Sequence, residues 1–391
     1  MKRVITTILS MIHSPMPRRA ANRGPLRTRR PDVLRSPLVA LWLAVALMGG
    51  SRADAEPMPV RHVQAVLLPG DQVSFQRDGV EMTRLVFGKA KAFRDQPFLF
   101  PVIGPSGNPL TINHGHDAEA ATHNSIWHSY GAINGIAFEG NHYDPKYPMS
   151  TGRQIHQRLE NVTNGEGSAS VTTLTHWVDI GKNPAETLLL EHRRYTVQPL
   201  DKGEWLLVVD SQFEAATDVT LGQSPIGFFS VKTTEALSIN GGGSNRISSG
   251  ETDLNGVSKK PAKWADYYGH PNPDAKESLL KVGNNGIEGD YYHQPNPNTK
   301  IIEGLAVFDH PKNLNYPTFW RARTHGRLMT SGITSDGVPV KLAKGKTLRL
   351  RYGVYVHGDQ PAAAIEARWQ AFATGDLDDL TPPKNPTKSP R

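Results

Sequence analysis

Short apolar stretches separated by turn residues are the feature that most constrains the fold of this chain. Val63, Ala65 and Leu67 occupy alternate positions before the turn sequence Pro69-Gly70-Asp71, and apolar runs cover 98–103 and 205–209. A period of two and runs of this length are typical of β-strands. A helical pattern is confined to 361–372. The spacing therefore predicts an all-β chain, a large antiparallel β-sandwich with one C-terminal helix. Further strands are expected at 73–75, 85–87, 171–178, 187–198, 228–232, 301–308, 327–331 and 348–356.

Two long segments, 108–150 and 240–300, lack this periodicity and are rich in Gly and Asn. We expect both to be irregular loops, and long ordered loops in a compact domain are often functional. No linker-like composition interrupts 56–375, which we expect to be a single β-sandwich domain. The Pro- and Lys-containing tail at 376–391 is expected to be disordered.

The N-terminus has the organisation of an export signal. Residues 1–37 are basic, 38–48 form an uninterrupted run of eleven apolar residues, and Ala53-Asp54-Ala55 provides the small-residue pattern of a cleavage site. This order predicts a signal peptide over 1–55 with cleavage after Ala55. Eleven residues are too few to cross about 30 Å of hydrocarbon as a helix, although an uncleaved anchor is the alternative. We therefore expect a periplasmic or secreted protein with no membrane contact after cleavage.

The net charge of the whole chain is a misleading indicator of its partners. The formal charge is +7, but residues 1–55 alone carry +8, so the rest of the chain carries −1. A basic face for nucleic acid is therefore not expected. The chain has no Cys, which excludes disulfides and thiolate chemistry, and it lacks the sequence motifs of serine hydrolases and nicotinamide enzymes.

Histidines gather in the first irregular segment, where five of the 15 fall within 29 residues: His114, His116, His123, His128 and His142. On an extended segment His114 and His116 share a face, so both can reach one metal ion, with the carboxylates of Asp117 and Glu119 nearby. Neutral imidazoles such as those of His123 and His128 also suit general acid–base catalysis without a cofactor. The remaining alternative is a polar loop of solvated, hydrogen-bonded His.

A second candidate follows the apolar run at 301–308, where Asp309-His310 precedes Pro311. A carboxylate that orients an imidazole is a common arrangement for proton transfer. Adjacent residues of a strand point to opposite faces, so a direct Asp309–His310 pair requires a turn, which Pro311 favours. The alternative is an aspartate that caps a turn.

Aromatic and arginine residues form the third candidate set. Arg321 and Arg323 share a face if this segment is extended, and the neighbouring Trp320 offers a ring for stacking on a sugar. Trp127, Trp264 and Tyr267 are expected to bind substrate in the same way. For all of them the alternative is a core aromatic residue beside surface arginines.

Several segments together resemble a family of exported bacterial proteins called PmoA-like, or "methane oxygenase PmoA". The segments occur in order at 97–109 (PFLFPVIGPSGNP), 125–127, 134–136, 264–267, 308–311, 317–323 and 348–357. The resemblance implies a sandwich like those of galactose mutarotases and a role in carbohydrate utilisation. The family typically carries the run D-H-P-H-H-R-S-L-W. Here the matching residues 119–127 keep His123 and Trp127 but lack two His and the Arg.

Three functions remain open at this point. The first is acid–base chemistry on a carbohydrate, of the epimerase, mutarotase or lyase type, with His123, His128 and the Asp309-His310 pair as catalytic residues. The second is a sandwich that binds glycans without catalysis, which requires exposed aromatic platforms. The third, taken from the family label, is a metal-dependent oxygenase.

Overall fold

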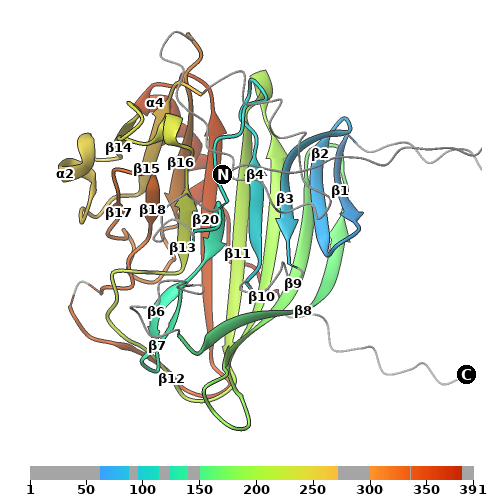
Figure 1. Ribbon diagram of the computed structural model, residues 1–391, viewed down its shortest axis with the longest axis vertical. Coiled ribbons are helices and arrows are strands. Elements are labelled where there is room, and N and C mark those ends of the chain that lie inside the picture. The colour runs from blue at the N-terminus through green and yellow to red at the C-terminus, as the bar shows by residue number, and fades with distance from the viewer. Residues whose placement is uncertain are drawn as a thin grey trace, which may run out of the picture. The chain divides into compact units, whose positions relative to one another are not determined.

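The computed structural model describes residues 62–87, 96–113, 123–139, 150–271, 300–334 and 336–380. The chain divides into the units Met1–Met58 and Pro59–Arg391, and every described residue belongs to the second. The predicted signal peptide over 1–55 lies outside the described residues. The second unit is built mainly from antiparallel strands, which confirms the predicted fold class (Figure 1).

Within the described ranges, the strands form two eight-stranded sheets and one four-stranded sheet. The first sheet has the order β1 (Val63–Leu68), β2 (Gln72–Arg77), β3 (Val80–Val86), β4 (Phe98–Val102), β5 (Ile126–His128), β13 (Phe229–Lys232), β18 (Arg327–Met329) and β17 (Arg321–Ala322). The second has the order β14 (Ser244–Ile247), β15 (Trp264–Gly269), β16 (Glu303–Asp309), β20 (Thr347–His357), β11 (Trp205–Ala215), β10 (Glu186–Pro199), β9 (Ala169–Asp179) and β8 (Gly152–Thr163). The small sheet has the order β19 (Val340–Leu342), β12 (Val219–Leu221), β6 (Tyr130–Ile133) and β7 (Ile136–Phe138).

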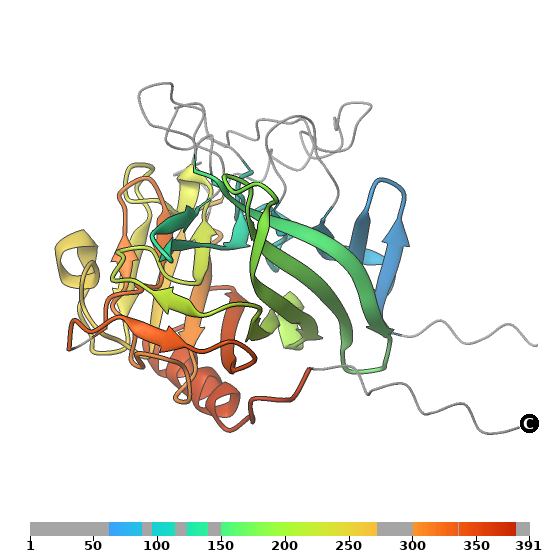
Figure 2. The ribbon, with the colours of Figure 1, turned by 90° about the horizontal axis from the view of Figure 1, so that it is seen from below.

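The main core lies between the first two sheets, because alternate residues of each strand point inward. From the first sheet Leu99, Ile126 and Val231 enter this core, and from the second Leu207 and Val307 do so. Each fully buried aliphatic side chain of this size contributes about 1.5–3 kcal/mol through the hydrophobic effect. The two sheets also meet at one edge, where β8 curves toward β1 (Figure 2). There the Val63 amide donates to the Gly165 carbonyl at 3.0 Å, and the Gly165 amide donates to the Val63 carbonyl at 3.2 Å.

The outer face of the second sheet is covered by the helix α4 (Ala362–Ala373), which confirms the predicted C-terminal helix. Ile365, Trp369 and Phe372 of α4 form a second apolar cluster with Ala306 and Phe308 of β16. Within the described ranges, no helix is long and apolar enough to cross a membrane.

The two segments expected to be irregular contain more structure than predicted. Residues 123–139 include β5, β6 and β7, and residues 240–271 include β14, the short helix α2 (Asp253–Val257) and β15. Strands of three or four residues are too short to display a period of two. In β15 the apolar pattern is interrupted by Asp266. This charged residue can be buried because Arg246 and His357 form ion pairs with its carboxylate.

Candidate functional site

Polar and aromatic side chains gather on the outer face of the first sheet, opposite its core face. Trp127 lies between Ile126 and His128, both of which point inward, so its ring points outward. Lys232 follows the inward-facing Val231 and lies directly across from Arg327 in the β13–β18 pairing. Two short strands and a hairpin therefore present Trp127, Lys232 and Arg327 on one face. We call these three residues, together with His123 and His325, the outer-face cluster.

The rings of the outer-face cluster are stacked. The ring centroid of His123 lies 5.6 Å from that of Trp127, at an interplanar angle of 24°, and 5.8 Å from that of His325, at 11°. The Arg327 guanidinium lies 5.6 Å from the Trp127 ring centroid, within the range of a cation–π contact. Two imidazoles, an indole and a guanidinium are thus in contact within a single layer.

Lys232 sets the protonation of His325. Its ammonium group donates to the backbone carbonyl of His325 and to Nδ1 of the same residue, at 3.0 Å in the second case. An ammonium group can only donate, so Nδ1 must accept and the His325 proton is held on Nε2. Lys232 is only 4% exposed, whereas His325 is partly exposed. The result is a neutral imidazole with a donating Nε2–H at the accessible end of the cluster.

The hairpin between β17 and β18 places His325 beside Lys232. Gly326 has φ +83°, a conformation that favours glycine, and a Cβ added there would lie 2.1 Å from Thr233 Oγ1. The close approach allows the Thr233 amide to donate to the Gly326 carbonyl at 2.9 Å. Gly326 therefore joins the hairpin to β13 and sets the distance between His325 and Lys232.

His128, predicted to be catalytic, lies in the core between the sheets. Its Nδ1 is 2.9 Å from Glu191 Oε1, and the other carboxylate oxygen accepts a bond from Trp177 Nε1 at 2.7 Å. Arg193 also donates to Glu191 and to the Tyr195 hydroxyl. Burial, and then the charge of Arg193, lower the pKa of His128 to about 4. His128 is therefore a neutral imidazole that links β5 to β10.

Asp309 and His310 do not form a direct pair. Asp309 accepts bonds from Asn313 Nδ2 and from the Thr318 amide, both at 2.8 Å, and burial raises its pKa to about 7. The His310 imidazole instead donates from Nε2 to the Gly375 carbonyl at 2.8 Å. Asp309 thus organises the loop that follows β16, and His310 holds the end of the C-terminal helix.

The predicted catalytic residues are distributed over three places. His310 packs edge-on against Phe372 of α4, on the outer face of the second sheet, whereas His123 stacks on the outer face of the first. The main core separates the two faces and contains His128. Of the four predicted catalytic residues, only His123 belongs to the outer-face cluster.

Three of the predicted substrate-binding aromatic residues are structural. Trp264, Tyr267 and Trp320 are at most 2% exposed. Trp264 Nε1 donates to Glu366 of α4, and Trp320 Nε1 donates to the Ala262 carbonyl. The Tyr267 hydroxyl donates to the Arg323 carbonyl at 2.7 Å, which supports the β17–β18 hairpin from the core side. Trp127, the fourth, belongs to the outer-face cluster.

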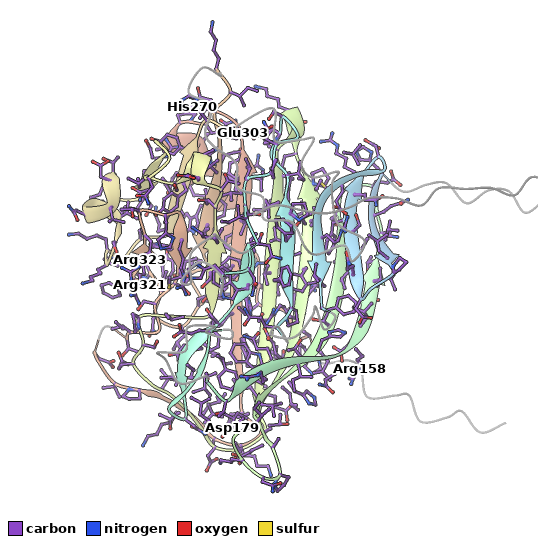
Figure 3. The ribbon with its side chains drawn as sticks, in the orientation of Figure 1. Arg158, Asp179, His270, Glu303, Arg321 and Arg323 are labelled. Carbon is purple, nitrogen blue, oxygen red and sulfur yellow. The ribbon has the colours of Figure 1, made fainter. Side chains whose placement is uncertain are left out.

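Arg321 and Arg323 do lie together, as the spacing predicted. Trp320 and Ala322 point into the core, so Arg321 and Arg323, which alternate with them, point away from the core. Both line a cavity of about 630 Å³ with Lys259, and Figure 3 shows the two residues side by side.

The predicted metal ligands His114 and His116, with Asp117, Glu119 and His142, lie outside the described residues. Among the residues that are described, no group of three His, Asp or Glu side chains is arranged to hold a metal ion. The metal hypothesis therefore stays a prediction about the segments 114–122 and 140–149.

Sequence reasoning missed Lys232, His325 and Arg327. Lys232 is the last residue of the run 228–232, which is otherwise mostly apolar. A lysine is rarely buried, so its place in a predicted buried strand is a signal of a specific role. His325 and Arg327 belong to a short stretch without periodicity, so no local signal marks them. Their relation to Lys232 arises from strand pairing across more than 90 residues.

Comparison with known proteins gives one result. The model of a family described as "Family of unknown function (DUF6807)" matches residues 72–370. That description carries no PmoA name. No curated protein matches the chain.

Proposed function

The chain belongs to the DUF6807 family of unknown function, and from the chemistry of its own residues we propose that it performs acid–base chemistry on a carbohydrate at the outer-face cluster. The observation that carries the proposal is the stack of His123 and His325 beside Trp127, with the cationic groups of Lys232 and Arg327 in contact with it. Imidazoles transfer protons near neutral pH, and the partly exposed His325 is the member of the stack that a substrate can reach.

The cations favour a substrate that develops negative charge. One imidazole removes a proton from a carbon next to a carboxylate or carbonyl, and the electron pair of that bond forms a carbon–carbon double bond. The charge that accumulates on oxygen is stabilised by Lys232 and Arg327, since buried cations act strongly on nearby developing charge. Delivery of a proton to the opposite face by the other imidazole gives an epimer.

Elimination is the other outcome of the same intermediate. The neighbouring carbon–oxygen bond breaks, its oxygen leaves with the bonding pair, and the Nε2–H of His325 supplies the proton that this oxygen needs while the Lys232 ammonium passes a proton to Nδ1, so that the imidazole ends neutral. His325 is suited to that role because Lys232 holds its proton on Nε2. Both outcomes fit the epimerase or lyase type, and neither requires a further reactant.

A non-catalytic glycan-binding module is the second candidate, and the burial of the tryptophans speaks against it. Open glycan-binding faces use exposed rings, but every tryptophan that the structure describes is at most 9% exposed. The only one on the outer face of the first sheet, Trp127, is 1% exposed and in contact with titratable groups. An enclosed ring beside imidazoles is more typical of a reaction site than of a platform.

The test is a screen of neutral and uronate-containing oligosaccharides followed by NMR for epimerised or unsaturated products. His123→Gln and His325→Gln should each lower turnover by about 10²–10⁴-fold, the usual contribution of a general acid or base. His62→Gln is the matched control, since His62 pairs with Asp78 away from the cluster. Binding with no turnover by any substrate would favour the glycan-binding module. Unchanged turnover in both cluster variants would refute the proposal.

A further inference from the structure

A second, separate binding site is formed by the cavity that Arg321 and Arg323 line. We propose that this cavity binds a small organic anion, a molecule with a phosphate or carboxylate group attached to an apolar body. The inference goes beyond the proposed function and does not depend on it, because none of the outer-face cluster residues lines the cavity.

The charge of the lining indicates the anionic part of the ligand. Lys259, Arg321 and Arg323 contribute three cationic side chains, and no acidic residue is among the described residues that line the cavity. Guanidinium groups bind oxyanions through two parallel hydrogen bonds. The hydroxyl groups of Ser258, Ser331 and Thr334 also line the cavity and can add further hydrogen bonds to an oxyanion.

The rest of the lining indicates the apolar part. Pro225, Phe319 and Ile333 form apolar walls. Ile333 is 43% exposed, so its side chain is accessible to a ligand in the cavity. The volume of about 630 Å³ is that of a typical small-molecule site and exceeds the size of a bare inorganic anion.

The backbone holds the cations in place. Lys259 has φ +66°, a left-handed conformation that costs about 1 kcal/mol or more for a residue other than glycine. Its amide donates to the Trp320 carbonyl at 2.6 Å, and Trp320 donates back to Lys260. The strained turn therefore fixes Lys259 against the strand that carries Arg321, and strain of this kind is concentrated at binding sites.

Isothermal titration calorimetry of the full chain with four probes tests the inference: phenyl phosphate, benzoate, inorganic phosphate and phenol. We expect one of the two aromatic anions to bind more tightly than inorganic phosphate, and phenol not to bind. Their order distinguishes a phosphate from a carboxylate ligand. Binding should weaken as ionic strength rises, because the cations are partly exposed to solvent.

Variants separate the two parts of the ligand. The double variant Arg321→Gln/Arg323→Gln should weaken the preferred aromatic anion by about tenfold or more, the effect of losing a bidentate charged contact. Ile333→Ser should reduce the preference for that anion over inorganic phosphate. Arg158→Gln is the matched control, since Arg158 lies on β8, far from Arg321 and Arg323 in Figure 3. Thermal unfolding midpoints equal to that of the wild type show that the variants are folded.

Absence of binding by both aromatic anions, or binding that the double variant leaves unchanged, would overturn the inference. So would equal affinity for inorganic phosphate and both aromatic anions, because the apolar walls would then have no role. Neither result would affect the outer-face cluster, whose test is turnover of a carbohydrate.

Discussion

Replacing His128 with glutamine should remove much of the acid sensitivity of this protein. The imidazole is buried in the core, in contact with Glu191, Phe213 and Phe229, and its pKa is lowered to about 4. In the unfolded chain the pKa returns to about 6.5. Between these two values the unfolded state binds more protons than the folded state, so stability falls as the pH is lowered.

The size of this effect follows from the two pKa values. Each pKa unit corresponds to about 1.4 kcal/mol, so the difference between about 6.5 and about 4 predicts a loss of about 3 kcal/mol from this single residue. The loss begins as the pH falls below 6.5 and is complete near 4. The charges that act on His128 are those of Arg193 and Glu191 on β10, and neither residue changes its charge in this range, because the pKa of Glu191 is held far below it and that of Arg193 far above.

Urea unfolding at pH 7.5, 6.5, 5.5 and 4.5 measures the effect for the wild type and for His128→Gln. The variant is expected to be less stable at pH 7.5, since an amide replaces the imidazole beside Glu191, but its stability should decline less toward pH 4.5. Two other groups contribute equally to both proteins: His156, whose pKa burial lowers to about 4, adds to the decline, and Asp309, whose pKa burial raises to about 7, opposes it, so the difference between the two curves is the quantity that isolates His128. Parallel stability curves for the two proteins would show that His128 is not a buried neutral imidazole, and the reasoning would fail.

Three other outcomes are expected. Gly326→Ala should lower the free energy of unfolding and the turnover more than Gly345→Ala, measured by urea unfolding and by the carbohydrate assay. Both positions have positive φ, but only at Gly326 would the new Cβ meet another atom, 2.1 Å away; equal losses would contradict this. Asp309→Asn should remove a decline in stability as the pH rises from about 4 to 7, because in this range the wild-type carboxyl ionises in the unfolded chain but, with its pKa raised to about 7, stays protonated in the folded core; a decline that persists in the variant would refute it. N-terminal sequencing of protein recovered from the periplasm or medium should begin after Ala55, and an intact N-terminus would contradict cleavage.

Much of the fold could be predicted because many strands are long enough to display their pattern. The strands expected at 187–198 and 348–356 correspond to β10 (Glu186–Pro199) and β20 (Thr347–His357). The turn at Pro69-Gly70-Asp71 was also expected, and Gly70 and Asp71 both have the positive φ that a tight hairpin requires. Local sequence carries this information, since alternation and turn chemistry are properties of neighbouring residues.

The candidate site was less predictable because its parts are distant along the chain. His123 and Trp127 were identified, but their neighbour His325 is some 200 residues away and is placed by a hairpin that only the pairing of β13 with β18 defines. The aromatic residues Trp264 and Tyr267 were expected to bind substrate, yet their polar atoms support α4 and the hairpin. An aromatic residue with a hydrogen-bonding group is equally suited to both roles, and only its surroundings decide between them.

The buried contact between His128 and Glu191 has a consequence for the opposite side of the first sheet. The strand β5 has only three residues and shares few backbone hydrogen bonds with its neighbours. Its middle residue is Trp127. Because adjacent residues of a strand point to opposite faces, the inward position of His128 determines that Trp127 lies on the outer face of the sheet. A shift of β5 by one position would turn His128 out of the core and break its bond to Glu191, which would keep only its bonds from Arg193 and Trp177. The buried bond between His128 and Glu191 thus fixes the side of the sheet on which the Trp127 ring lies. A substitution of Glu191 should therefore disturb the contact between Trp127 and His123 on the other face of the first sheet.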